Sequence, residues 1–165
     1  MQRTKAYLLS VVLLTAIWLL LTYPFSVPEL VAGLVAAIVI SLLPTGAADV
    51  LREVRVSPRA IAAAVAYLFV FLVALVRANL DVAFRVLRPS LPIAPGIVRI
   101  QTSLRTPLAR TLLANSITLT PGTITVDARD DVFYVHWISV AEEDIEQATK
   151  KIVGSFERYL EVFLG

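Results

Sequence analysis

The sequence lacks most of the side chains from which catalytic and metal centres are built. It has no cysteine and a single histidine, His136, among 165 residues. Without cysteine the chain cannot form disulfides, thiolate metal sites, iron–sulfur clusters or a cysteine nucleophile. One histidine cannot hold a metal by itself, and Gly122 stands alone rather than in a glycine-rich nucleotide loop. These absences predict that the chain is not an enzyme and uses no metal or other cofactor.

Charge is scarce as well. Charged residues make up 17% of the chain, and 15 basic residues nearly balance 13 acidic ones, which argues against a nucleic-acid partner. The sequence is instead 58% hydrophobic, with a mean hydropathy of +0.78, whereas ordinary soluble domains are roughly 45–50% apolar. This composition indicates that part of the chain is built for lipid.

Three long apolar runs lie in the first half of the chain, at 7–23, 27–43 and 60–76. The first and third contain no charged residue, and the second contains only Glu29. A bilayer-spanning helix needs about 20 apolar residues, with a working range of about 17–25. Each run reaches the lower end of that range, so the sequence predicts a multi-pass protein of the cell membrane, with the lipid bilayer as a partner.

Prolines and helix caps set the expected bounds of three helices at about 7–23, 28–43 and 58–88, which form a membrane module over 1–88. The turn between the first two is short, so they are predicted to form a tight antiparallel hairpin. The second helix is rich in small residues that allow helices to approach closely in lipid, namely Ala32, Gly33, Ala36 and Ala37. Ser57-Pro58 is a typical start for the third helix, and Pro89 ends it.

The last third of the long third helix is charged. Arg77, Asp81, Arg85 and Arg88 follow at intervals of four, four and three, so they share a face and can form an ion ladder. We therefore expect Asp81 to be held as a carboxylate by Arg77 and Arg85 and to have a structural role. The helix is expected to leave the hydrocarbon near Arg77.

The remainder of the chain resembles a small soluble domain over 97–165, preceded by a proline-rich linker at 89–96. Alternating apolar residues and turn signals predict the order β-α-β-β-α. The elements expected are a strand at 97–102, a helix at 106–116, a hairpin of strands at 123–128 and 132–140, and a helix at 141–163. The fold class is thus membrane α plus small α+β, with a three-stranded sheet that carries both helices on one face.

Two groups of residues in this domain have structural interpretations. The acids Asp127, Asp130 and Asp131 cluster at the hairpin turn, where Asp is favoured for backbone reasons, and we prefer that interpretation to a cation site. Acids are also favoured in the first turn of the last helix, by its dipole; these are Glu142, Glu143 and Asp144. The expected core face of that helix is Ile145, Ala148, Ile152, Phe156, Tyr159 and Phe163.

Four segments resemble the E subunit of Mrp-type (Mnh, Sha) multisubunit monovalent cation/proton antiporters. They are ANLDVAFRVLRP at 78–89, PGIV at 95–98, LLANSITLTPGTIT at 112–125 and YVHWI at 134–138. The block from Asn115 to Thr123 is long and distinctive, and the order of the segments agrees over essentially the whole chain. The resemblance implies a membrane complex that exchanges cytoplasmic Na⁺ for external H⁺, with the ion path mainly in its large antiporter-like subunits.

The resemblance also gives candidate interface or motif residues. Asn115 and Ser116 are expected to cap or terminate a helix, Pro121-Gly122 to set a turn, and Asn79 and Asp81 to anchor the domain or bind a neighbour. The full set of candidates is Asn79, Asp81, Arg85, Asn115, Ser116, Thr120, Pro121, Gly122 and Thr123.

The function predicted is that of an accessory, structural subunit of such an antiporter, with the other subunits as partners. One alternative is the homologous subunit of a membrane-bound hydrogenase or related respiratory complex, and a further one is a membrane-tethered ligand-sensing domain. Three basic groups, near 3–5, 52–59 and 77–88, all favour the cytoplasmic side, which three full spans cannot satisfy. We therefore expect a cytoplasmic domain and a third helix that runs partly along the membrane surface.

Overall fold

The computed structural model describes residues 2–24, 26–43, 50–140 and 145–165. Its chain divides into two compact units, Met1–Val54 and Arg55–Gly165. The long helix therefore packs with the α+β domain, although the sequence pattern groups it with the first two apolar helices. Each unit is described by itself.

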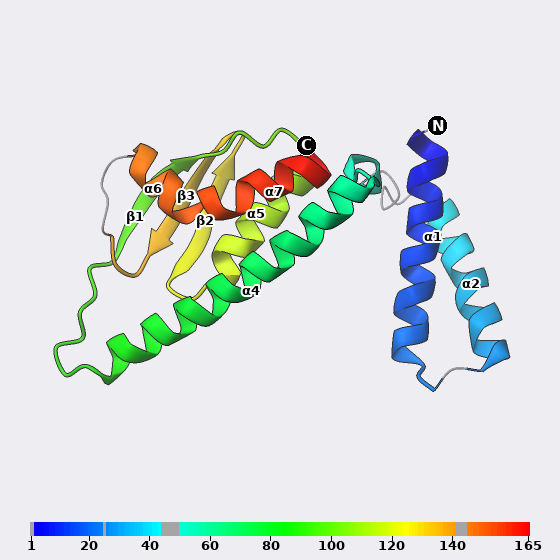
Figure 1. Cartoon of the computed structure of the whole chain (residues 1–165), viewed down its shortest axis with the longest axis horizontal. Coiled ribbons are helices and arrows are strands. Elements are labelled where there is room, and N and C mark those ends of the chain that lie inside the picture. Colours follow the sequence, from blue (N-terminus) through cyan, green and yellow to red (C-terminus); the bar gives the residue numbers. More distant parts are fainter. Residues whose placement is uncertain (1, 25, 44–49, 141–144) are drawn as a thin grey trace. The chain divides into compact units, whose positions relative to one another are not determined.

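The first unit is a helical hairpin. Helix α1 (Gln2–Leu21) packs against α2 (Val27–Leu42), and a short 3-10 helix, η1 (Leu51–Glu53), follows (Figure 1). The Lys5 ammonium donates to the Val54 carbonyl oxygen at 2.7 Å, which ties the start of α1 to the segment after η1. The tight hairpin expected from the two prolines is thus present.

Small residues form the contact between α1 and α2. On α2 they recur at every fourth position, as Gly33, Ala37 and Ser41, and all three are buried. The Ser41 hydroxyl donates to Ser10 at 3.0 Å. A Cβ at Gly33 would lie 2.5 Å from Cδ1 of Trp18, so only glycine fits this approach. Of the four small residues singled out in the sequence, Gly33 and Ala37 are therefore buried against α1, whereas Ala32 is exposed.

The second unit begins with α4 (Pro58–Leu87). Ser57 caps this helix, because its hydroxyl accepts from the amide of Ala60 at 3.1 Å. By length and apolar composition two helices suffice to cross a membrane, α1 over Arg3–Leu21 and α4 over Pro58–Leu87. Helix α2 has 16 residues, just short of the range of about 17–25 for a span.

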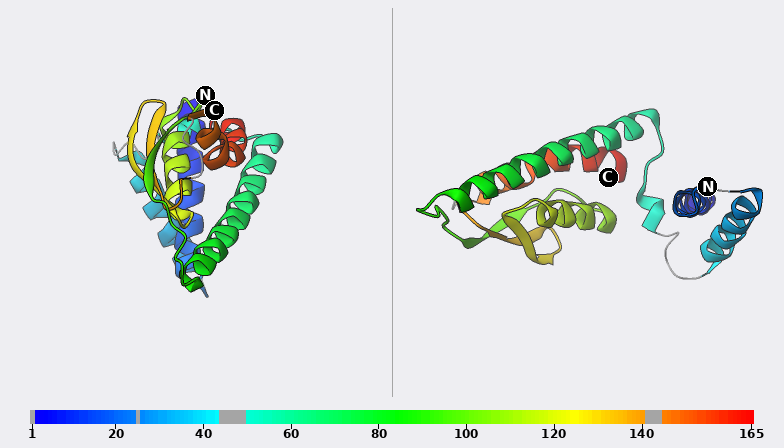
Figure 2. Two further views of the ribbon diagram at one scale, coloured as in Figure 1. Left: turned by 90° about the vertical axis from the view of Figure 1, so that its left-hand side faces the viewer. Right: turned by 90° about the horizontal axis from the view of Figure 1, so that it is seen from below.

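The sheet is antiparallel in the order β1-β3-β2, with strands β1 (Gly96–Gln101), β2 (Thr123–Arg129) and β3 (Val132–Trp137). Alternation along the strands buries one face of the sheet, chiefly through Val98, Ile100, Phe133 and Val135. Helix α5 (Pro107–Leu119) packs on β2, α6 (Ile145–Ile152) packs on β1, and α7 (Gly154–Leu164) packs between α5 and α4 (Figures 1 and 2). This arrangement confirms the predicted fold class.

The last helical segment differs from the sequence prediction. One helix was expected over 141–163, but the structure has α6 and α7, and they are separated at Val153. The first-turn acids of the predicted helix lie at 142–144, outside the described residues. The break occurs because the two halves pack on different neighbours, and it changes the core face. Beside Phe156, the buried residues of α7 are Leu160 and Leu164, in place of Tyr159 and Phe163.

Candidate functional site

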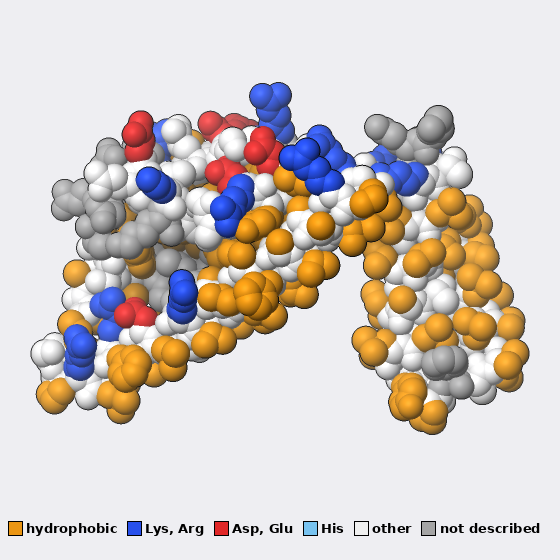
Figure 3. Space-filling model, in the orientation of Figure 1, with side chains coloured by type: hydrophobic (Ala, Val, Ile, Leu, Met, Phe, Trp, Pro, Cys, Tyr) orange, Lys and Arg blue, Asp and Glu red, His pale blue; other side chains and the backbone are white. Residues whose placement is uncertain are grey.

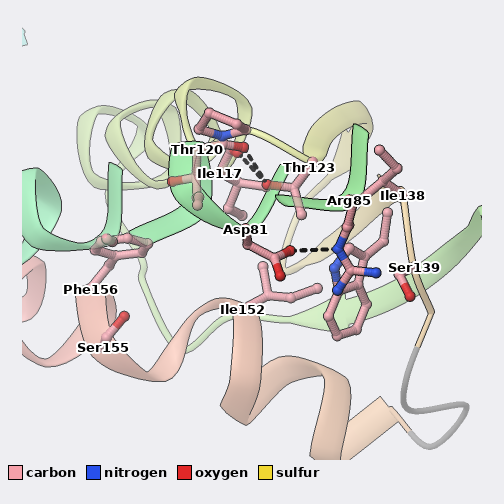
Figure 4. A pocket seen from close by; sticks show the side chains of 15 residues that line it. Asp81, Arg85, Ile117, Thr120, Thr123, Ile138, Ser139, Ile152, Ser155 and Phe156 are labelled. Carbon is pink, nitrogen blue, oxygen red and sulfur yellow. Dashed lines mark hydrogen bonds and ion pairs between the residues drawn. The ribbon is translucent and has the colours of Figure 1, made fainter. Parts of the chain in front are cut away.

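A cavity of about 230 Å³ lies where the second half of α4 passes the turn between α5 and β2 (Figure 4). Its other walls come from the end of β3 and from α6 and α7. Six of the nine candidate residues line it: Asp81, Arg85, Thr120, Pro121, Gly122 and Thr123. Two of the segments that carry the family resemblance are about 35 residues apart in the sequence, and they meet at this cavity.

The turn from α5 to β2 is built by hydroxyl groups and one glycine. The Thr120 hydroxyl donates to the Ser116 carbonyl at 2.7 Å, and the Thr123 hydroxyl donates to that of Ile117 at 2.6 Å. Both carbonyl groups also accept from the amide of Thr120, so these hydroxyls add a second bond at each carbonyl in the last turn of α5. Gly122 has φ +93°, and its carbonyl accepts from the amide of Ile138 at 2.8 Å. The block therefore sets the geometry of one cavity wall.

Asp81 and Arg85 supply the charges of the cavity. The Arg85 Nε donates to Asp81 Oδ2 at 2.7 Å (Figure 4). The Arg85 Nη1 also donates to the Pro92 carbonyl, at 2.8 Å. The Asp81 side chain is 58% exposed, whereas that of Arg85 is 26% exposed. The predicted ladder is only partly present, because among the described residues no ion pair joins Asp81 to Arg77.

The other three candidates lie elsewhere. The exposed Asn79 donates to the Leu75 carbonyl of its own helix at 2.8 Å. Asn115 and Ser116 lie inside α5, which extends to Leu119, so the expectation that they end the helix is wrong. The helix is longer because the hydroxyls of Thr120 and Thr123 accommodate its last carbonyls.

Ser116 belongs to a contact that sequence reasoning missed. It is 2% exposed and hydrogen-bonds with the phenol of Tyr67 on α4. The Tyr67 ring also lies 6.2 Å from that of Phe156 and 5.7 Å from that of Phe163, centroid to centroid. The aromatic residues of α4 and α7 are visible in the sequence, but the sequence does not show that these two helices pack together. This cluster fixes α4 against the domain and so positions the cavity.

The chemistry available at the cavity is that of hydrogen bonding and one ion pair. Among the residues that the structure describes, no group of three or more His, Asp or Glu side chains could hold a metal ion. At the hairpin turn Asp127 pairs with Arg129 at 2.8 Å, and Asp130 adopts φ +53°, as a turn requires.

Asp81→Asn should cost no more than about 0.5 kcal/mol of domain stability, because exposed ion pairs separated by one helical turn contribute only about 0.3–0.5 kcal/mol. Hydrogen exchange of the α4 amides in the full chain measures this loss of stability. Asp127→Asn, which removes the exposed pair with Arg129, is the matched control. A markedly larger loss of protection would show that the Asp81 carboxylate contributes more than an exposed ion pair does.

The apolar helices, together with the α+β fold, define a membrane protein with a small α+β domain. A family model described as a Na⁺/H⁺ ion antiporter subunit (MNHE) matches residues 11–162, and the chain belongs to this family. The resemblance noted in the sequence is thereby confirmed.

Two curated relatives are each named as the E subunit of a Na⁺/H⁺ antiporter. That of Alkalihalophilus pseudofirmus is 38% identical over 100 residues, which are 61% of this chain and 63% of the relative. That of Bacillus subtilis is 40% identical over 95 residues, 56% of this chain and 59% of the relative. The matched part of this chain thus spans about three fifths of each relative.

A solved structure covers nearly all of the fold. It is a chain from the membrane-bound sulfane sulfur reductase (MBS), described as an archaeal respiratory membrane complex. The likeness has a TM-score of 0.83 and 38% identity, and it covers 96% of this chain and 99% of that one. The fold described above is therefore one that occurs in a multisubunit membrane complex.

Proposed function

We propose that this chain is an accessory, non-catalytic subunit of a multisubunit Na⁺/H⁺ antiporter and that its partners are the other subunits of that complex. The observation that carries the proposal is the family match over residues 11–162. The names of both curated relatives agree with it. In this function the chain supports assembly, and the cavity that gathers the family block offers a place where a neighbouring subunit binds.

The distribution of ionisable groups supports an accessory role. A proton or ion path needs such groups along its length inside the membrane. Between 60 and 76, α4 has no charged residue. In the hairpin Glu29 lies in the first turn of α2 and accepts a hydrogen bond from Trp18 Nε1 at 3.2 Å. The described part of the apolar helices thus offers no relay of its own.

The isolated full chain is expected to transport nothing. The test is to reconstitute it alone in liposomes with an internal pH dye and to apply a Na⁺ gradient. Proton movement equal to that of empty vesicles is the expected result, because the apolar runs at 7–23, 27–43 and 60–76 contain no charged residue except Glu29. Sodium-driven proton movement above that background would contradict the accessory role.

A second candidate is the homologous subunit of a respiratory membrane complex. The likeness to a chain of the sulfane sulfur reductase, over 96% of this chain, favours it. Purification from the native host in a gentle detergent, with identification of the co-purifying subunits, separates the two. Antiporter-like subunits alone indicate the antiporter, whereas an added set of redox subunits, of hydrogenase or sulfur-reductase type, indicates the respiratory complex. A chain that purifies alone would contradict both.

A ligand-sensing domain fits the cavity less well. Its volume is about 230 Å³, whereas small-molecule sites usually measure about 300–1,000 Å³. Its two charged groups, Asp81 and Arg85, are also already paired with each other. We therefore prefer an assembly role for this site.

The α+β domain is proposed to lie on the cytoplasmic side of the cell membrane, where the basic groups near the apolar helices are favoured. Because the chain has no cysteine, Ser155→Cys in α7 and Ser26→Cys before α2 give matched probes. A membrane-impermeant maleimide should label Ser26→Cys in intact spheroplasts and Ser155→Cys only after lysis. Labelling of Ser155→Cys before lysis would place the domain outside.

A further inference from the structure

The outward face of α4 is a long apolar surface. Val65, Phe69 and Val76 on this face are 64%, 67% and 58% exposed. With Leu72, Leu80 and Leu87 they form a stripe that follows the helix nearly from end to end, since residues three and four apart share a face. Hydrophobic side chains dominate this side of the molecule in Figure 3. In water such a surface is costly, so something apolar must cover it.

The opposite face of α4 faces the α+β domain, where it packs on α7 and borders the cavity. At its start, the amide of Arg55 donates to the Phe163 carbonyl at 2.8 Å. In the middle, Tyr67 contacts Ser116 and the aromatic rings of α7. Near its end, Arg85 donates to Pro92. The helix itself is about 45 Å long, at about 1.5 Å per residue, and these contacts attach it to the domain at three points.

If α4 crossed a bilayer, the part of the α+β domain packed on it would have to enter the hydrocarbon as well. The segments beside α4 include irregular backbone, and α7 carries Glu157, Arg158 and Glu161. Exposed irregular backbone does not occur within the hydrocarbon of a membrane, and charged side chains there are costly. The apolar length of α4 therefore does not make it a free span.

Arg59 and Arg77 of α4, together with Arg88 directly after it, lie on one flank of the apolar stripe. Arg59 and Arg77 are 18 residues apart, five full helical turns, and Arg88 follows 11 residues later, about three turns. All three are exposed. A helix with an apolar face and cationic residues beside it is suited to the membrane–water interface, where the cations reach anionic headgroups.

We propose that α4 lies in the plane of the membrane, with its apolar stripe inserted in lipid, its arginine flank at the headgroups and the α+β domain on the aqueous side. The partner of this surface is an anionic lipid leaflet. The proposal rests on the membrane location given above but not on antiport. It also has a consequence for topology, because a hairpin followed by an in-plane helix leaves all three basic groups on one side.

The test measures depth along α4 in the full chain. Single cysteines at Val65, Leu72 and Leu80 carry an environment-sensitive fluorophore, in liposomes that contain anionic phospholipid and a nitroxide placed either shallow or deep in the acyl chains. Because Val65 and Leu80 are 15 residues apart, a crossing helix separates them by about 22 Å in depth, whereas an in-plane helix keeps them level. Ala78→Cys, on the covered face, is the matched control.

The result expected is stronger loss of fluorescence with the shallow nitroxide than with the deep one, in the same ratio at all three positions, and little loss at Ala78→Cys. A ratio that changes steadily from Val65 to Leu80 would show a crossing helix and overturn the proposal. The same labels in the co-purified complex test a protein partner. Protection from both nitroxides there would mean that a neighbouring protein covers the stripe, which also overturns it. Neither the depth measurement nor the measurement in the complex depends on ion transport. Failure of this proposal can therefore be told apart from failure of the proposed antiporter function.

Discussion

Gly122→Ala should destabilise the α+β domain by about 2 kcal/mol, a factor of roughly 30 in the ratio of folded to unfolded chains. Gly122 has φ +93°, a conformation that costs a residue with a side chain about 1–3 kcal/mol. The added methyl group would also lie 3.0 Å from Cγ2 of Ile138, closer than normal contact. Both effects act at the wall of the cavity, where the turn meets β3.

The measurement is hydrogen exchange of the β3 amides, Val132–Trp137, in the detergent-solubilised full chain. Gly154→Ala is the matched control, since the nearest atom to an added Cβ there is the Lys150 Cγ at 3.9 Å. That variant should leave stability unchanged or raise it by up to about 1 kcal/mol, because alanine is the better helix former. Equal effects of the two substitutions would contradict a special role for Gly122.

Glu157→Ala should cost about 1.5–3 kcal/mol, the range for hydrogen bonds to a charged group. One carboxylate oxygen of Glu157 accepts from the Thr102 hydroxyl at 2.6 Å and from both the amide and the hydroxyl of Ser103. Thr102 is 8% exposed, so the substitution would leave its hydroxyl buried without an acceptor. This carboxylate joins the chain after β1 to the first turn of α7.

Protection of the α7 amides against hydrogen exchange measures the loss of stability caused by Glu157→Ala. Glu161→Ala, one turn further along α7 and exposed, is the matched control and should change stability by less than about 0.5 kcal/mol. Glu157→Gln keeps an acceptor oxygen but loses its charge, so it should fall between the two. If Glu157→Ala were as mild as Glu161→Ala, the three bonds would be of no consequence to the fold.

Local signals were sufficient for most of the elements. Ser57-Pro58 and Pro89 bound α4 because capping and the missing proline amide act within one helical turn. Alternation and the Asp130 turn defined the β2–β3 hairpin for the same reason. The family block was also readable from sequence, and so was the membership it confers.

What α4 packs against was decided by tertiary structure. An apolar run of this length fits a membrane span equally well, and composition cannot show that Tyr67 meets Ser116 or that Phe156 covers the same helix. The division of the last helix at Val153 is of the same kind, since its two halves follow different neighbours. The cavity likewise exists because distant segments converge on it.

The sequence by itself determined the class of protein, the start of α4 and the β2–β3 hairpin, since each depends on neighbours within a few positions. Only the tertiary structure decided which face of α4 is covered by the chain and which is left apolar. That choice depends on long-range packing, in which the aromatic rings and small residues of distant segments must fit together, and no local pattern contains that information.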